Sequence, residues 1–214
     1  MTDAPNARWK RRKDARPAEI LDSALTVFAE RGFAATRMDD IAARAGVTKG
    51  TIYLYFRSKE AVFKSLVQES LGAAIEVMRD NAARFEGPAP DLLRTILRGI
   101  GRFVCASDRA ALPKIILAES GNFPHLVEFY RREVVDRGLA LLQSVIRRGI
   151  ERGEFRTVEP GHAARLCVAP LLMAAVWRTT FAQFDSTPYD LNGLVETHID
   201  VLLTGLAAER KNPA

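Results

Sequence analysis

The stretch TRMDDIAARAGVTKGTIYLYFRSK, residues 36–59, decides the fold of this chain. Its first half predicts a short amphipathic helix, because four apolar residues share one face at i, i+3, i+4 and i+7: Met38, Ile41, Ala42 and Ala45. Thr36 offers a capping hydroxyl in front of this helix, with Asp39 three residues further on. Gly46 follows where a helix end favours a positive φ. Two short helices around a glycine-containing turn predict a helix-turn-helix.

The second helix of this motif has an apolar inner stripe and a polar outer face. Thr48 is placed to cap it, and Ile52 and Phe56 lie four residues apart on the inner stripe. The outer face carries hydroxyls, a cation and phenols, which suit phosphates and base edges, from Thr48, Lys49, Thr51, Tyr53 and Tyr55. Core packing is the alternative interpretation for Tyr53.

The segment GVTKGTIYLYFRSKEAVF, residues 46–63, resembles the recognition helix and following turn of the tetracycline-repressor (TetR) family of bacterial transcriptional regulators. The preceding segment PAEILDSALTVFAERGFAATRMDDIA, residues 17–42, is similar to the same pattern. The resemblance covers roughly residues 14–74. It implies an all-α fold, with a three-helix DNA-binding domain followed by a larger helical domain for effector binding and dimerisation.

The resemblance also implies a role for each residue of the motif. Thr36 and Arg37 would hold a phosphate at the start of their helix, where an anion is favoured. Lys59 would hold another phosphate, and so would Tyr53 and Tyr55. The start of the recognition helix would enter the major groove of double-stranded DNA with Thr48, Lys49, Gly50 and Thr51. Two copies would bind a palindromic operator, because one small motif contacts few bases.

The positive charge of the chain lies in its N-terminal part. Residues 1–64 hold thirteen Lys or Arg and eight Asp or Glu, whereas the remainder holds eighteen of each. This distribution accounts for the net charge of +5. Six cations form a basic N-terminal segment, which we assign as a DNA-binding arm over residues 1–13 and the residues just after it: Arg8, Lys10, Arg11, Arg12, Lys13 and Arg16. A solubilising tail is the alternative.

The rest of the chain predicts helices throughout, about nine in total. The first covers Ala18–Arg31, and a long one from Ser58 to about Arg84 links the two domains. We assign residues 14–74 to the DNA-binding domain, with the motif at about 37–56, and residues 75–214 to the effector-binding and dimerisation domain. No apolar run is long enough to span a membrane and no secretory signal occurs, so we expect a cytoplasmic protein, associated with the nucleoid when bound to DNA.

The last two predicted helices, 161–184 and 191–208, carry more apolar residues than one domain core requires. Leu166, Leu172 and Val176 are examples from the first, and Leu194 and Val201 from the second. Two helices from each of two subunits would bury this excess as a four-helix bundle, so we predict a homodimer. Packing within one monomer is the alternative.

By analogy with the family, the second domain is expected to enclose a small, lipophilic effector. Candidate lining residues are aromatic and apolar residues of its helices, and one cation that could anchor an anion or pair with Glu119: Phe103, Ile116, Phe123, Phe129, Tyr130, Met173, Trp177, Arg178 and Phe181. Aromatic residues at helical spacing also serve as ordinary core, which is the alternative for each of them. An effector would release a repressor from DNA by favouring another spacing of the recognition helices. The long linking helix would transmit this change from the second domain to the first.

Other functions find little support in the sequence. No phosphate-binding glycine loop, nucleophile motif or zinc motif occurs, so we expect neither an enzyme nor a cofactor or metal. Cys105 and Cys167 are too few and too far apart for a disulfide framework. The alternative function is a helix-turn-helix regulator without a small ligand, controlled by a protein partner or by thiol oxidation.

Overall fold

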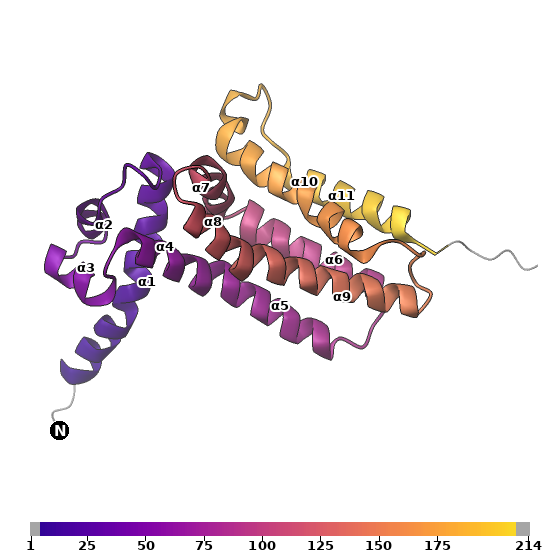
Figure 1. The fold of residues 1–214 in the computed structure, drawn as a ribbon, viewed down its shortest axis with the longest axis horizontal. Coiled ribbons are helices and arrows are strands. Elements are labelled where there is room, and N and C mark those ends of the chain that lie inside the picture. Colours follow the sequence, from indigo (N-terminus) through magenta and orange to yellow (C-terminus); the bar gives the residue numbers. More distant parts are fainter. Residues whose placement is uncertain (1–4, 209–214) are drawn as a thin grey trace, which may run out of the picture.

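The computed structural model describes the backbone of residues 5–208 and the side chains of residues 16–208. Within this range the protein is all-α, as predicted, and its single β-type contact is an isolated antiparallel bridge between Phe155 and Ala207. Figure 1 shows an elongated molecule, with the N-terminal helices at one end and the C-terminal helices along the other. Residues 1–4 of the predicted basic arm lie outside the described residues.

The N-terminal module consists of four helices. They are α1 (Pro5–Arg31), α2 (Met38–Arg44), α3 (Lys49–Tyr55) and α4 (Lys59–Val67). The backbone of α1 is helical from Pro5 rather than from about Ala18, so it includes part of the predicted arm. Three buried phenylalanine rings form the centre of the module, with ring centroids 5.2 to 6.0 Å apart: Phe28, Phe33 and Phe63. Tilted and edge-on packing of such rings favours one arrangement of α1 and α4.

Three long helices of the molecule each contain a π turn. One runs through α4, η1 (Gln68–Gly72) and α5 (Ala73–Arg84). Another joins α6 (Ala89–Ile100) to η2 (Gly101–Cys105), and a third joins α8 (Pro124–Tyr130), η4 (Arg131–Asp136) and α9 (Arg137–Glu151). When helices that continue without a break are counted once, the described residues form nine, as the sequence predicted.

The remaining elements complete the C-terminal part. They are the short η3 (Asp108–Ala110), α7 (Ala111–Glu119), α10 (Pro160–Thr180), η5 (Ala182–Phe184) and α11 (Leu191–Leu206). Figure 1 shows α10 and α11 side by side along one edge of the molecule. Their starts are capped as the chemistry of the sequence requires, because Glu159 accepts from the backbone N–H of Gly161 and Asp190 accepts from that of Gly193.

The hydrophobic core does not divide at the predicted domain boundary. Residue 74 falls inside the continuous α4–η1–α5 helix, and the core of the N-terminal module continues into α7 and α8 through Leu112, Ile116 and Leu126. A second core joins α6, α9, α10 and α11. The N-terminal module is therefore packed directly on α7 and α8, through α1 and α4. None of the helices in the described part of the chain is long and apolar enough to cross a membrane.

Candidate nucleic-acid interface and ligand cavity

The second helix of the predicted motif, α3, has the two faces that its sequence implies. Ile52 and Phe56 are buried, whereas Thr48, Lys49 and Gly50 are exposed at its start. Thr48 caps the helix, since its hydroxyl accepts from the backbone N–H of Thr51 at 3.2 Å. The turn before it relies on Gly46, whose φ of +63° is the left-handed conformation that glycine adopts most readily.

The exposed side chains of α2 and α3 form a polar and basic surface that also includes one exposed leucine. Lys49 Nζ lies 3.0 Å from Asp39 Oδ2, and this hydrogen bond raises the pKa of Lys49, which therefore stays charged. Tyr53 is exposed, and Tyr55 packs partly against the module core. Leu54 is 82% exposed at the end of α3, a position that the sequence pattern did not single out.

The loop before α2 differs from its predicted capping pattern. The residue that caps α2 is Arg37 rather than Thr36, and its backbone N–H donates to Asp40 Oδ2 at 2.9 Å, so Asp40 takes the place predicted for Asp39. Thr36 is only 2% exposed, and its hydroxyl donates to the Gly32 carbonyl at 2.7 Å. The Thr36 side chain is thus directed into the loop, which corrects its predicted contact with a phosphate.

Lys59 also has an internal role in place of the predicted phosphate contact. Its Nζ donates to the carbonyl oxygens of Phe33, Ala34 and Thr36 at 2.9, 2.8 and 3.1 Å. The same ammonium lies 4.8 Å from the centroid of the Phe33 ring. One cation can satisfy several carbonyls because it has three donors and no acceptor. Lys59 therefore holds the α1–α2 loop, from which α2 begins.

The end of α7 holds the same loop from the other side. Glu119 Oε1 accepts from the backbone N–H of Ala34 at 2.9 Å, and Asn122 donates to its other oxygen at 3.3 Å. Just beyond, the ring of Phe123 packs edge-on against Phe33, with centroids 4.9 Å apart. The loop in front of the helix-turn-helix is therefore attached to the C-terminal part of the protein.

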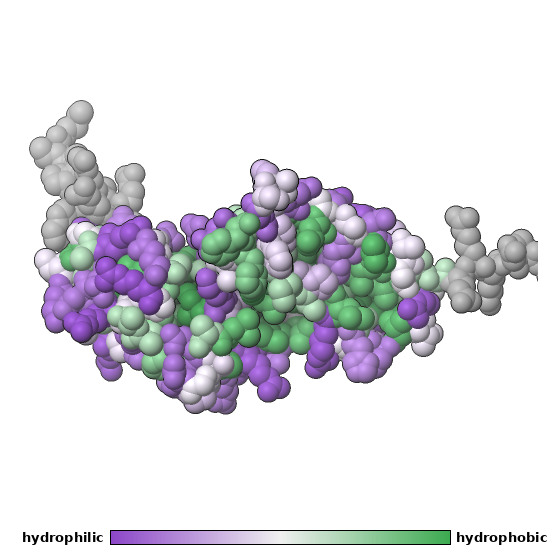
Figure 2. All heavy atoms as spheres, turned by 90° about the horizontal axis from the view of Figure 1, so that it is seen from above, coloured by the Kyte–Doolittle hydropathy of each residue, from purple (hydrophilic) through white to green (hydrophobic). Residues whose placement is uncertain are grey.

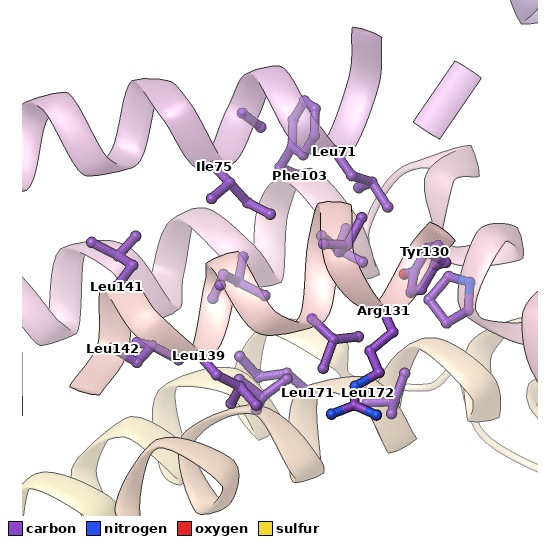
Figure 3. A pocket seen from close by; sticks show the side chains of 18 of the residues that line it. Leu71, Ile75, Phe103, Tyr130, Arg131, Leu139, Leu141, Leu142, Leu171 and Leu172 are labelled. Carbon is purple, nitrogen blue, oxygen red and sulfur yellow. The ribbon is translucent and has the colours of Figure 1, made fainter. Parts of the chain in front are cut away.

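An apolar cavity of about 310 Å³ lies between the helices of the C-terminal part. Its wall comes from α5, α6, α7, α8, α9 and α10, and all three π turns contribute side chains to it. Figure 3 shows Leu71 and Ile75 on one side and Leu171 and Leu172 on another. The volume is at the lower end of the range of about 300–1,000 Å³ for small-molecule sites. π turns are frequent at functional sites, which makes this cavity the candidate ligand site.

Three of the nine predicted lining residues border this cavity, namely Phe103, Ile116 and Tyr130. Phe123 and Phe129 instead belong to the contact between the N-terminal module and α8. Arg178 lies outside the cavity and donates to the Ser107 carbonyl rather than pairing with Glu119. Three others are exposed on the surface of α10 or just after it, and the first two line a separate pocket between α10 and α11: Met173, Trp177 and Phe181.

The cavity has only two strongly polar side chains among its lining residues, Tyr130 and Arg131. Burial raises the pKa of Tyr130, so its phenol stays neutral. Arg131 lies at the start of η4, and Figure 3 shows its side chain extending beside Leu172. Sequence reasoning missed Arg131, because an Arg-Arg pair within a long helix is most simply explained as solvent-exposed.

Both cysteines are buried and free. Desolvation raises the pKa of Cys105 to about 11 and that of Cys167 to about 12. Because the thiolate is the form that reacts, these surroundings make both thiols slow to oxidise. Among the described residues, no group of His, Cys, Asp and Glu side chains is arranged to hold a metal ion.

Two family models match the chain. One is described as bacterial regulatory proteins, tetR family, and matches residues 20–66; the other is the AefR-like transcriptional repressor C-terminal domain, which matches residues 91–205. The second model alone covers more than half of the chain.

Relatives along the whole length agree with these matches. An uncharacterised helix-turn-helix regulator, YfiR of Bacillus subtilis, is 28% identical over 94% of this chain and 97% of its own. The fatty acid metabolism regulator protein of the same bacterium is 28% identical over 91% of this chain and 98% of its own.

Solved structures show the same fold. The transcriptional regulator FadR from Bacillus subtilis, in complex with stearoyl-CoA, superimposes with a TM-score of 0.74 and 26% identity over 88% of this chain and 98% of that one. The ketosteroid regulator KstR2 of Mycobacterium tuberculosis, at 22% identity over 91% of this chain and 96% of that one, shares the fold with a TM-score of 0.70.

Proposed function

The chain belongs to the TetR family of bacterial transcriptional regulators, and we propose that it is a repressor that binds a palindromic operator as a homodimer and leaves it when a lipophilic effector fills its cavity. The observation that carries this proposal is that α7 borders the cavity with Ile116 and holds the helix-turn-helix loop with Glu119. Operator DNA lies in the bacterial cytoplasm, and we expect the protein to act there, at the nucleoid.

The proposed DNA surface consists of the exposed part of the motif. Arg37 at the start of α2 contacts a phosphate, and the first turn of α3 enters the major groove with Lys49 and Thr51. The other contacts come from the remaining side chains and backbone of that surface: Thr48, Gly50, Tyr53 and Tyr55. When DNA is present, Lys49 breaks its contact with Asp39 and donates to a base edge or a phosphate instead. Two motifs about 34–36 Å apart, or a multiple of that spacing, would read the two half-sites.

The proposed dimer forms through α10 and α11. Exposed apolar side chains recur along one stripe of α10 and its end, at Leu166, Met173, Trp177 and Phe181, and Leu194 and Val201 extend the surface onto α11. Figure 2 views the molecule from this side and shows hydrophobic surface along its middle, while hydrophilic surface dominates the end with the DNA-binding helices. Apolar patches of this kind mark interfaces between proteins.

The proposed effector is a molecule with a long hydrocarbon chain. The cavity wall is formed almost wholly by aliphatic side chains, which stabilise an alkyl chain in proportion to the area removed from water. The FadR structure of Bacillus subtilis, which shares this fold at 26% identity, was determined with stearoyl-CoA. Buried thiols with raised pKa values give no support to control by oxidation.

Two helices connect the cavity to the DNA surface in this mechanism. The α4–η1–α5 helix borders the cavity with Leu71 and carries Lys59, while α7 borders it with Ile116 and carries Glu119. An effector that fits best when these helices shift would favour a dimer whose recognition helices no longer match the operator. By thermodynamic reciprocity, operator DNA weakens effector binding by the same factor.

The test begins with selection of bound duplexes from a random pool, followed by anisotropy titrations at several salt concentrations. We expect an enriched palindrome, affinity that falls with salt, and release by stearoyl-CoA. Gly138 borders the cavity with open space around it, so Gly138→Leu should fill the cavity and block release while operator binding is kept. Ala140→Leu, exposed on the same helix, is the matched control.

The dimer is tested separately by sedimentation. Met173 is 58% exposed on α10 and Val77 is 60% exposed on α5, so a glutamate at either position spares the core. Met173→Glu should give monomers at micromolar concentration and lose operator binding, whereas Val77→Glu should stay dimeric. A monomeric wild-type protein, or a protein with no salt-sensitive affinity for any duplex, would contradict the proposal. If no lipophilic compound releases the protein from its operator, control by a protein partner is favoured instead.

A further inference from the structure

The cavity has one charged lining residue, Arg131, whose side chain is 74% exposed and therefore lies where the cavity meets solvent. Three apolar lining residues are themselves exposed, so the cavity is open to solvent on their side: Leu117, Val135 and Leu172. Figure 3 shows the guanidinium of Arg131 beside Leu172. An apolar cavity with one cation at its mouth matches a molecule with an apolar chain and one anionic end.

The present partner of Arg131 holds it weakly. Its Nε lies 3.5 Å from Asp136 Oδ1, and the two side chains are 74% and 51% exposed. Charge-assisted hydrogen bonds of this kind are normally about 2.7–2.9 Å long, and exposed ion pairs contribute little. The π turn brings these two residues, five apart in sequence, to the same side of the helix. Four further guanidinium N–H donors have no partner in this contact.

The neighbouring polar groups do not compete for this position. Arg132 is directed to Glu133 and to the ring of Phe129. Tyr130 borders the same cavity as a neutral phenol and supplies no charge. Glu133 pairs with Arg137 across one helical turn. Arg131 and Asp136 are therefore the pair at the mouth whose contact an incoming anion can replace.

We propose that Arg131 anchors the anionic head of the effector and that Asp136 occupies Arg131 until the effector arrives. This inference rests on the proposed function and specifies its ligand class: a long-chain amphiphile with a carboxylate or phosphate at one end. The chain fills the apolar cavity, and the head displaces the Asp136 carboxylate from the guanidinium. The guanidinium fork accommodates either anion with two parallel hydrogen bonds.

The two partners of this pair have opposite expected effects. Arg131→Gln removes the positive charge and should weaken an anionic ligand by about tenfold or more, the effect of losing hydrogen bonds to a charged group. Asp136→Asn removes the competing carboxylate and should strengthen the same ligand by about twofold to fivefold. Neither change should alter the affinity of an uncharged ligand with the same chain by more than about twofold.

The experiment measures equilibrium binding to the full-length chain by titration calorimetry. Three ligands share an eighteen-carbon chain: stearate, stearoyl-CoA and 1-octadecanol, each used below its aggregation limit. The variants are Arg131→Gln, Asp136→Asn and the matched control Arg132→Gln, with circular dichroism to verify folding. We expect Arg131→Gln to lose affinity for the anions alone, and loss with only one anion identifies the carboxylate or the phosphate as the natural head.

The results separate this inference from the proposed function. If wild type binds all three ligands and Arg131→Gln binds the anions as wild type does, the anchor is refuted while the effector cavity stands. Equal weakening of 1-octadecanol, or weaker anion binding by Asp136→Asn, would also refute it. If wild type binds none of the three ligands, the proposed function itself fails.

Discussion

Replacing Lys59 with methionine should destabilise the N-terminal module while it leaves the DNA surface chemically unchanged. The methionine keeps the length and apolar stem of the side chain but removes the cation that binds three loop carbonyls, those of Phe33, Ala34 and Thr36. Two of these contacts are partly buried, and the one to Ala34 is exposed. Their carbonyls would have to find water or stay unpaired.

The magnitude follows from these contacts. A hydrogen bond to a charged group contributes about 1.5–3 kcal/mol, and the exposed contact contributes least because water replaces it. Three bonds that share one ammonium are not additive, so we expect a loss of about 3 kcal/mol in the free energy of unfolding. With a urea dependence of about 2 kcal/mol per molar, the midpoint should fall by about 1.5 M.

The assay is urea unfolding followed by circular dichroism, with Lys64→Met as the matched control. Lys64 is half-buried on the same helix, and its Nζ lies 5.4 Å from the centroid of the Phe129 ring. That control should lose only about 0.5–1 kcal/mol. If Lys59→Met unfolds within about 0.5 kcal/mol of wild type but reduces the salt dependence of operator binding by about one charge, then Lys59 is a phosphate contact and the internal role is refuted.

Three further predictions concern coupling, thiol reactivity and packing. Glu119→Ala removes the acceptor for Ala34 N–H, so the effector should reduce operator affinity by about threefold to thirtyfold less than it does in wild type. Glu128→Ala, at an exposed position, is the control. If the ratio of operator affinities with and without effector stays unchanged in Glu119→Ala, this route of coupling is excluded. The pKa values of Cys105 and Cys167 are raised to about 11 and about 12. At neutral pH both thiols should therefore react with a thiol reagent far more slowly in native than in urea-unfolded protein, and the native rate should increase as pH rises. Rapid labelling of the native protein would count against their burial. Gly149→Ala places a methyl group against the Phe155 ring and should lower the free energy of unfolding in urea by about 1–3 kcal/mol. Gly205→Ala, with open space around it, should leave the stability unchanged. Equal stability of the two variants would show that the Phe155 ring moves aside.

The sequence predicted the helix-turn-helix well because short-range chemistry specifies it. Gly46 at positive φ, the Thr48 cap and the buried Ile52 are local features, and the structure has all three. The long helix that begins after Ser58 and ends at Arg84 was predicted for the same reason. The α1–α2 loop was harder, because its fixed shape depends on contacts from distant residues such as Lys59 and Glu119.

The cavity was only partly predictable. Aromatic residues at helical spacing show that a helix has an apolar face, but not whether this face meets a cavity, a neighbouring module or the molecular surface. Phe103 borders the cavity, Phe123 packs on the N-terminal module and Trp177 is exposed, although all three occur in similar apolar sequence. Arg131 gave no signal in the sequence, since its position depends on the packing of α8–η4–α9 against α10.

The three π turns have a consequence for how this fold tolerates changes in chain length. Each accommodates one residue more than an α-helical segment of the same length, so the residues beyond it lie about 100° from where an uninterrupted α-helix of the same sequence would place them. A single-residue deletion within Gln68–Gly72, Gly101–Cys105 or Arg131–Asp136 could be absorbed by conversion to ordinary α-helix. Such a deletion would leave the flanking helical segments facing as they do now and would change only the side chains of the turn itself, and because these side chains line the cavity, the ligand site would change while the fold stayed the same.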